Sequence, residues 1–192
     1  MSNSTVDLGS WFHGWLACVV ATCTLSCGHA GTSSPSTGSI DALDDHFESA
    51  HEFALNWSTD AARDPGVAIE LGEGMSGRGV TLSVAEGGSS GGVVLRRRID
   101  TASLRGTRVK VHVHARVGGT GAAHARLELT AESPGSTPGY QDVTRSRDSA
   151  ALEWLPLGVV ADIGPETTSL LISLILDGTG TASFDDLVIE QI

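Results

Sequence analysis

The chain has 192 residues, of which 23 are acidic and 12 basic, and its formal net charge at pH 7 is −11. This length suits one domain with a hydrophobic core and is short for two. The acidic balance excludes the basic surface that nucleic acids and anionic lipid headgroups require, so we expect neither as a direct partner.

The N-terminus resembles an export signal. Residues 11–25 form an apolar run, which is too short to span a membrane but typical of the hydrophobic part of a signal peptide. A small residue precedes Cys27 and a glycine follows it, and this resembles the lipobox of bacterial lipoproteins, in which the cysteine is acylated. The pattern departs from that motif at Thr24 and in the absence of Lys and Arg from residues 1–10. We predict a signal peptide over residues 1–26 and lipidation at Cys27, with an ordinary secreted protein as the alternative.

A tether and one domain are predicted to follow the signal. Residues 27–39 are small and polar and contain Pro35, which is typical of a flexible linker. Residues 40–192 are predicted to form the folded domain. We therefore expect a protein of the bacterial cell envelope, lipid-anchored or secreted, that touches the membrane only through its anchor.

From residue 40 onward the sequence consists of short strand-like runs separated by turns, in a chain with 24 glycines. Strict alternation of apolar and polar side chains in two of these runs indicates antiparallel strands with one buried face. The predicted strands are 67–71, 80–84, 93–99, 109–117, 125–131, 152–160, 170–176 and 181–189. Strands at this spacing predict an all-β fold, an antiparallel β-sandwich.

Three stretches give more specific expectations. The last two strands are joined by the tight turn at residues 177–180 and are predicted to form a hairpin. The polar stretch 132–149 is predicted to be a long loop of the kind that carries function. A helical turn is expected only within residues 41–55, because no other stretch shows a 3.6-residue apolar period.

Several features in chain order resemble a known family. They are Phe47-Glu48 followed by Trp57, a glycine-rich turn before a strand at 76–82, Ile99-Asp100 before an alternating strand, Trp154 at the start of 154–157, and the closing run 178–187. This order resembles the galactose-binding-like jelly roll of xylan- and cellulose-binding modules, over about residues 40–192. The resemblance implies a jelly-roll domain that binds carbohydrate without catalysis.

The resemblance also implies a structural Ca²⁺ between the first and last strands. Glu48 and Asp186 match the ligand positions of such modules, and Asp185 and Asp45 are further candidates. Two carboxylates and backbone carbonyls would begin the set of six to eight oxygens that Ca²⁺ takes. Alternatively, one aspartate caps a loop by accepting backbone N–H bonds while its neighbour faces water.

Aromatic side chains are the usual stacking platform for sugar rings. The resemblance assigns Phe47, Trp154 and Phe184 to packing, which leaves Trp57 and Tyr140 for stacking. Two aromatic rings make a small platform, so the alternative of a domain without sugar affinity stays open.

Two histidines share one face of a predicted strand, since His112 and His114 are two positions apart. They could bind a metal together with His124 or Glu128 of the next strand, bond sugar hydroxyls, or form a solvated polar face. Arg97, the centre of an arginine triplet, is predicted to face inward, towards a carboxylate or the ligand.

No enzyme is predicted. Residues 87–91 and 88–92 both match G-x-S-x-G, but a nucleophile elbow needs a helix after the serine, and a strand-like run follows here. We therefore expect a non-catalytic cell-surface binding module that recognises a polysaccharide or another envelope polymer. The alternative is a structural or protein-interaction ectodomain without sugar affinity.

Overall fold

The computed structural model describes residues 43–59, 65–88, 92–119, 123–135, 139–146 and 153–192. These all belong to one compact unit of the chain, Gly38–Ile192. The predicted signal peptide, the tether, Cys27 and the serines of the G-x-S-x-G motifs lie outside the described residues.

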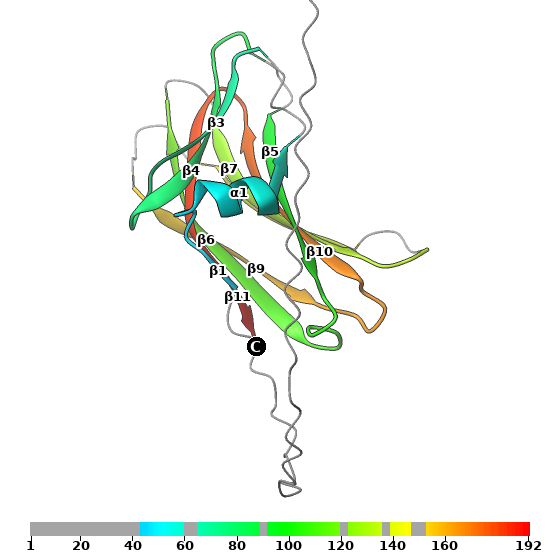
Figure 1. The fold of residues 1–192 in the computed structure, drawn as a ribbon. Helices are drawn as coiled ribbons and strands as arrows, with labels where there is room; N and C mark the ends of the chain where they lie inside the picture. Colours follow the sequence, from blue (N-terminus) through cyan, green and yellow to red (C-terminus); the bar gives the residue numbers. More distant parts are fainter. Residues whose placement is uncertain (1–42, 60–64, 89–91, 120–122, 136–138, 147–152) are drawn as a thin grey trace, which may run out of the picture. The chain divides into compact units, whose positions relative to one another are not determined.

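The described part folds into two antiparallel sheets (Figure 1). Sheet A has the order β3-β4-β11-β6-β9, with β1 also paired to β11, and sheet B has the order β2-β5-β10-β7-β8. The strands are β1 (Leu43–Asp45), β2 (Trp57–Thr59), β3 (Val67–Glu73), β4 (Arg78–Val84), β5 (Val93–Asp100), β6 (Arg108–Gly118), β7 (His124–Glu132), β8 (Gly139–Ser146), β9 (Leu155–Asp162), β10 (Ser169–Asp177) and β11 (Gly180–Gln191). The predicted all-β sandwich is confirmed.

The core lies between the inner faces of the two sheets. Alternate residues of β6 and β7, such as Val111 and Leu127, are fully buried, while the residues between them are partly exposed. Burying a side chain of this size contributes about 1.5–3 kcal/mol. Phe47 and Phe184 are also core residues, as the resemblance implied.

The one helix among the described residues is α1 (Ala50–Asn56), within the stretch where a helical turn was expected. It begins after Ser49, whose Oγ accepts a hydrogen bond from the backbone N–H of Glu52 (3.2 Å), and such an N-cap satisfies an otherwise unpaired donor. The helix ends at Trp57, where β2 begins. Among the described residues, no helix is long and apolar enough to cross a membrane.

The predicted terminal hairpin is wrong. β10 belongs to sheet B and β11 to sheet A, so the short link between them carries the chain from one sheet to the other. Gly178 and Gly180 both have positive φ, a conformation that suits glycine in sharp turns. A short glycine-rich link therefore does not by itself distinguish a turn within a sheet from a crossing between sheets.

The loop predicted over residues 132–149 is also wrong in part. Residues Gly139–Ser146 form β8, an edge strand that pairs with β7 along its whole length. Its sequence, GYQDVTRS, contains little of the apolar alternation that identifies a strand. An edge strand has only one neighbour, so its pairing can be set by β7 rather than by its own pattern.

Candidate functional site

Asp185 and Asp186 lie at the point on β11 where its pairing changes from β4 to β1. β11 pairs with β4 up to Phe184 and with β1 from Leu187 onward, and its register with β6 shifts between Asp185 and Val188. Asp186 has a left-handed φ of 51°. This irregularity is a β-bulge, and it explains why Phe184 and Leu187 both face the core although an odd number of positions separates them.

Asp185 ties β11 to the turn between β3 and β4. Its side chain is fully buried, and Oδ2 accepts hydrogen bonds from the backbone N–H groups of Met75 (2.8 Å) and Ser76 (2.9 Å). Its Oδ1 accepts a third from the N–H of Asp186 (2.8 Å). Gly74 permits this close approach, because a Cβ there would lie 2.5 Å from Oδ2 of Asp185. A buried carboxylate requires such partners, since an unpaired one carries a large desolvation penalty.

Glu48 holds the same turn through a second contact. Its Oε1 accepts a hydrogen bond from the backbone N–H of Arg78 (2.9 Å), and Nη1 of Arg78 lies 3.5 Å from the carbonyl oxygen of Glu48. Gly77 has a φ of 83°, and a Cβ at that position would lie 1.9 Å from Oε1 of Glu48. The glycine is therefore required both by backbone conformation and by the closeness of the carboxylate.

Asp186 lies between two imidazoles. Its Oδ1 is 2.8 Å from Nδ1 of His46, and its Oδ2 is 3.8 Å from Nδ1 of His114. His46 follows β1, His114 lies on β6, and Asp186 lies on β11. The carboxylate therefore connects the N-terminal segment of the domain to its closing strand.

Asp45 joins β1 of sheet A to the inner face of sheet B. Its carboxylate pairs with the guanidinium of Arg97 on β5 and accepts hydrogen bonds from Nε1 of Trp57 (2.9 Å) and from the N–H of Phe47 (3.0 Å). The prediction that Arg97 faces inward towards a carboxylate is confirmed. Trp57 is only 7% exposed, its ring is 5.5 Å from that of Phe47, and the guanidinium of Arg97 lies 6.0 Å from its centroid. This burial removes Trp57 from the candidate ligand surface.

We call Asp45, Glu48, Asp185 and Asp186 the carboxylate clasp. These are the residues that the resemblance proposed as Ca²⁺ ligands, but each of them is engaged by a nitrogen of the protein. For Asp185 the geometry matches the loop-capping alternative. Because Ca²⁺ takes six to eight oxygen ligands, this nitrogen-rich set fits the ion poorly. Among the described residues, no three His, Cys, Asp or Glu side chains form a group that could hold a metal ion.

The two histidines of β6 lie on the outer face of sheet A. His112 and His114 are flanked by β11 on one side and β9 on the other. Their proposed metal partners, His124 and Glu128, lie on β7 of sheet B, so that combination of ligands is wrong. Strands that follow each other in the chain were expected to be neighbours, but β6 and β7 separate into different sheets.

The predicted ligand residues therefore do not converge. Trp57 and Arg97 meet in the core beside Asp45, and the two histidines lie outside sheet A. Tyr140 lies on β8 of sheet B opposite Thr130, and its side chain is outside the described part. No single surface holds all five residues.

The outer face of sheet B brings together polar side chains from several strands. Residues directly opposite each other in antiparallel strands project to the same face, and the inward neighbours Leu95, Leu127 and Leu174 are buried. The central row across β2, β5, β10 and β7 consists of Ser58, Arg96, Ser173 and Glu128, of which Ser173 is only 3% exposed. The next row contains Arg98, Leu171 and Thr130.

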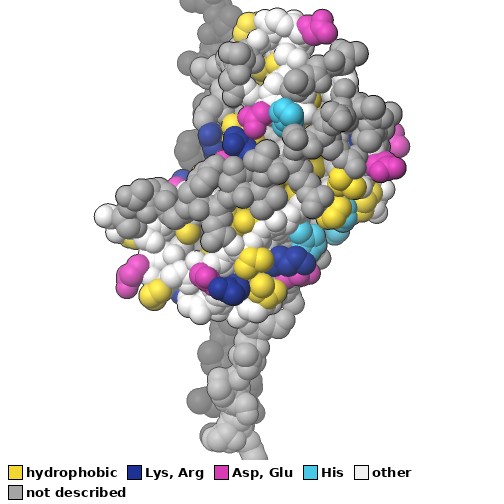
Figure 2. Space-filling model, turned by 180° about the vertical axis from the view of Figure 1, so that it is seen from behind, with side chains coloured by type: hydrophobic (Ala, Val, Ile, Leu, Met, Phe, Trp, Pro, Cys, Tyr) yellow, Lys and Arg dark blue, Asp and Glu magenta, His cyan; other side chains and the backbone are white. Residues whose placement is uncertain are grey.

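Ion pairs connect several of these side chains. Arg98 pairs with Glu132, and Nε of Arg126 lies 3.4 Å from Oδ2 of Asp177. Figure 2 shows one face of the molecule on which basic side chains likewise lie beside acidic ones. Each arginine carries five donors and each carboxylate about four acceptor positions. One ion pair therefore leaves part of this hydrogen-bonding capacity for a ligand.

Sequence reasoning did not find this row. Alternation places Arg96 and Glu128 on polar strand faces, but the pairing order that aligns them through Ser173 is a property of the sheet. One signal was available in the sequence. Arg96 is next to Arg97, and neighbouring residues of a strand point to opposite faces, so an inward Arg97 predicts an outward Arg96.

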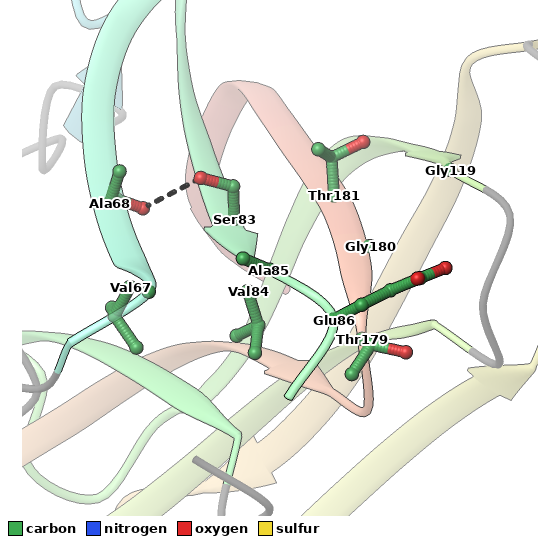
Figure 3. Close-up of a pocket in the computed structure, with 11 residues that line it drawn as sticks. Val67, Ala68, Ser83, Val84, Ala85, Glu86, Gly119, Thr179, Gly180 and Thr181 are labelled. Carbon is green, nitrogen blue, oxygen red and sulfur yellow. Dashed lines mark hydrogen bonds between the residues drawn. The ribbon is translucent and has the colours of Figure 1, made fainter. Parts of the chain in front are cut away.

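A hollow of about 550 Å³ lies near the start of β11 (Figure 3). Its floor is a row of small residues, Ala68, Ser83 and Thr181, in which Oγ of Ser83 donates to the carbonyl of Ala68 (3.4 Å). Glu86 is the one charged residue among its described lining residues, which include no aromatic ring. With few convergent polar groups, this hollow is a weaker candidate than sheet B.

No protein-family model and no curated protein matches the sequence. Among solved structures, the chain is similar to the CBM22-1-GH10 modules of the Clostridium thermocellum endo-1,4-beta-D-xylanase 10B complexed with xylohexaose, at 19% identity and a TM-score of 0.59. That match covers 78% of this chain but only 28% of the xylanase chain. The CBM22-1 xylan-binding domain of Paenibacillus barcinonensis Xyn10C is similar at 13% identity and a TM-score of 0.56, over 78% of this chain and 93% of that one.

A family 11 carbohydrate-binding module from Clostridium thermocellum, in complex with a beta-1,3-1,4-mixed-linked tetrasaccharide, gives 14% identity and a TM-score of 0.52, over 76% of this chain and 92% of that module. At these identities the similarity lies in the fold. The jelly-roll β-sandwich expected from the sequence is therefore confirmed as the fold of this domain.

Proposed function

We propose that the domain is a non-catalytic binding module that holds a carbohydrate chain across the outer face of sheet B. The observation that carries this proposal is that Arg96 and Glu128, both partly exposed, lie in one row on either side of the buried Ser173, across three adjacent strands. Sugar hydroxyls both donate and accept hydrogen bonds, and this row offers donors and acceptors side by side. The shared fold with modules whose structures contain xylohexaose or a mixed-linkage tetrasaccharide supports the same function.

We further propose that the module is displayed on the bacterial cell surface through a lipid on Cys27. The apolar run before this cysteine and the polar stretch after it support export and tethering. Mass spectrometry of the protein from membranes should find a diacylglyceryl adduct on Cys27. An unmodified cysteine, or cleavage at another position, would contradict the anchor.

A second function is favoured by one observation. Among the described side chains on the outer face of sheet B, none is aromatic, and Trp57 is buried; the one aromatic residue at a described register position of this face is Tyr140, opposite Thr130. With a single tyrosine for stacking, the face could instead bind a protein of the envelope, because sugar recognition relies heavily on aromatic planes. The alternative is therefore a structural or protein-interaction ectodomain without sugar affinity.

A glycan array with the purified full chain separates these functions, followed by affinity measurements with Arg96→Ala and Glu128→Ala. Each substitution should weaken binding about tenfold or more, since hydrogen bonds to charged groups contribute about 1.5–3 kcal/mol. His112→Ala and His114→Ala on sheet A serve as matched controls and should leave affinity unchanged. Loss of binding in the histidine variants alone would transfer the ligand face to sheet A, and no binding to any glycan would favour the second function.

A further inference from the structure

We infer that the carboxylate clasp closes the sandwich without a metal ion. In this arrangement, each carboxylate that the family resemblance would assign to Ca²⁺ already contacts a nitrogen of the protein. The inference concerns how the two ends of the jelly roll are held together, and it is independent of any ligand on sheet B.

Asp185 gives the strongest evidence. Its carboxylate is fully buried and already accepts three backbone N–H bonds of 2.8–2.9 Å, from residues 75, 76 and 186. Each N–H group directs a partial positive charge at the carboxylate. A cation would have to displace these donors and leave them unpaired in a buried position, which carries a penalty for each one.

The other carboxylates of the clasp are engaged in the same way. Asp45 is neutralised by the guanidinium of Arg97 and also accepts the indole N–H of Trp57. Oδ1 of Asp186 lies 2.8 Å from Nδ1 of His46. The permanent positive charge of Arg97 removes the electrostatic reason for Asp45 to recruit a cation.

The hollow beside the clasp carries charges of both signs. It has a volume of about 190 Å³ and is lined by the carboxylates of Asp45, Glu48 and Glu52, with Arg97 and His46 in the same wall. On the other side of Glu48, the guanidinium of Arg78 reaches its carbonyl oxygen at 3.5 Å. A cation in this hollow would therefore meet the guanidinium of Arg97 beside these carboxylates, and the guanidinium of Arg78 beside the carbonyl oxygen of Glu48.

The clasp connects three segments that are distant in sequence. Asp45 and Glu48 belong to the segment around β1, the turn at residues 74–78 joins β3 to β4, and Asp185 and Asp186 lie in the bulge of β11. The bulge is where β11 leaves β4 and takes up β1. The hydrogen-bonded carboxylates stabilise this junction, which is the role that an ion between the first and last strands would otherwise have.

Thermal unfolding of the full chain tests the inference directly. The melting temperature should agree to within about 1 °C in excess EDTA and in excess Ca²⁺, because no ion binds the folded state. A site with a dissociation constant of about 10 μM would instead raise it by about 5–10 °C at about 1 mM Ca²⁺. A rise of that size in the wild-type protein would overturn the inference.

Asp185→Asn provides the second readout. The amide nitrogen cannot accept a backbone N–H bond, so the variant should melt about 5–10 °C lower, equally in EDTA and in Ca²⁺. Asp162→Asn, at an exposed surface pair, is the matched control and should lower the melting temperature by no more than about 2 °C. If Asp185→Asn does not fold, Glu48→Gln replaces it, because the Gln oxygen can still accept the Arg78 N–H. A wild-type Ca²⁺ response that either variant abolishes would contradict the inference.

Discussion

The carboxylate clasp and the outer face of sheet B are built from the same chemistry, carboxylates beside N–H donors, but they differ in exposure. In the clasp, Asp185 is fully buried and the side chain of Asp45 is 17% exposed, beside that of Arg97 at 12%, although Glu48 is exposed. On sheet B, the side chains of Arg98 and Glu132 are 62% and 29% exposed. This difference in exposed fraction indicates that burial, more than residue type, decides whether a polar pair is structural or remains accessible to a ligand.

The physical reason is the cost of desolvation. A buried charge that loses its partner stays out of water, and removing one member of such a pair destabilises a protein by about 3–5 kcal/mol. An exposed pair returns to water when broken and contributes about 0–1 kcal/mol. Variants that break one ion pair in each region, followed by measurement of the free energy of unfolding, therefore compare the buried pair with the exposed one.

Arg97→Ala should have the largest effect. It leaves Asp45 largely buried with only N–H partners, so we expect the free energy of unfolding in urea to fall by about 3 kcal/mol. The double variant Asp45→Ala/Arg97→Ala is the control, and it should lose less than the sum of the two single variants. A loss below about 1 kcal/mol for Arg97→Ala would mean that this pair behaves as an exposed one.

Gly77→Ala should have an intermediate effect on the same end of the molecule. The alanine Cβ would displace the carboxylate of Glu48 from the N–H of Arg78 and would also strain a positive φ, for about 2 kcal/mol in all. Gly106→Ala is a matched control, because Gly106 has a φ of 73° and nothing within 4 Å of the added Cβ. The free energy of unfolding of Gly106→Ala should fall by only about 1 kcal/mol. Equal losses in urea unfolding would show that the contact with Glu48 contributes nothing.

Arg98→Ala should have a small effect on stability. Its ion pair with Glu132 is exposed, so the free energy of unfolding should change by less than about 1 kcal/mol. Arg97→Ala is the comparison, because Arg97 is the next residue on the same strand and its ion pair is largely buried. A loss of more than about 2 kcal/mol for Arg98→Ala would place the ion pairs of sheet B with the structural ones.

The smallest effect is expected at Arg108 and Asp162. Arg108 donates to both oxygens of Asp162 (2.6 and 2.9 Å), and these hydrogen bonds lower the pKa of Asp162. A lowered folded-state pKa contributes stability above the unfolded pKa and loses it as the pH falls through the folded value. Because both side chains are exposed, salt should screen the pair. NMR titration should show the pKa of Asp162 rising in Arg108→Ala and in high salt, and an unchanged value would contradict the pair.

The local pattern of the sequence was sufficient to predict most strands and several core residues. Alternation in β6 and β7 predicted which side chains are buried, and the odd position of Arg97 predicted that it faces inward. The candidate site was less predictable. Trp57 was assigned to a ligand surface because the family resemblance assigned Phe47, Trp154 and Phe184 to packing, but the indole N–H of Trp57 donates to the partly buried Asp45.

The sequence by itself determined the period-two strands and the glycine-rich turns, because these depend on residues a few positions apart. Only the tertiary structure decided that β10 and β11 lie in different sheets, that β8 is a strand, and that Arg96, Ser173 and Glu128 share one row. It also decided that Asp185 accepts N–H bonds from the turn after β3. These features depend on pairing between segments far apart in the chain, which the alternation within a single strand does not specify.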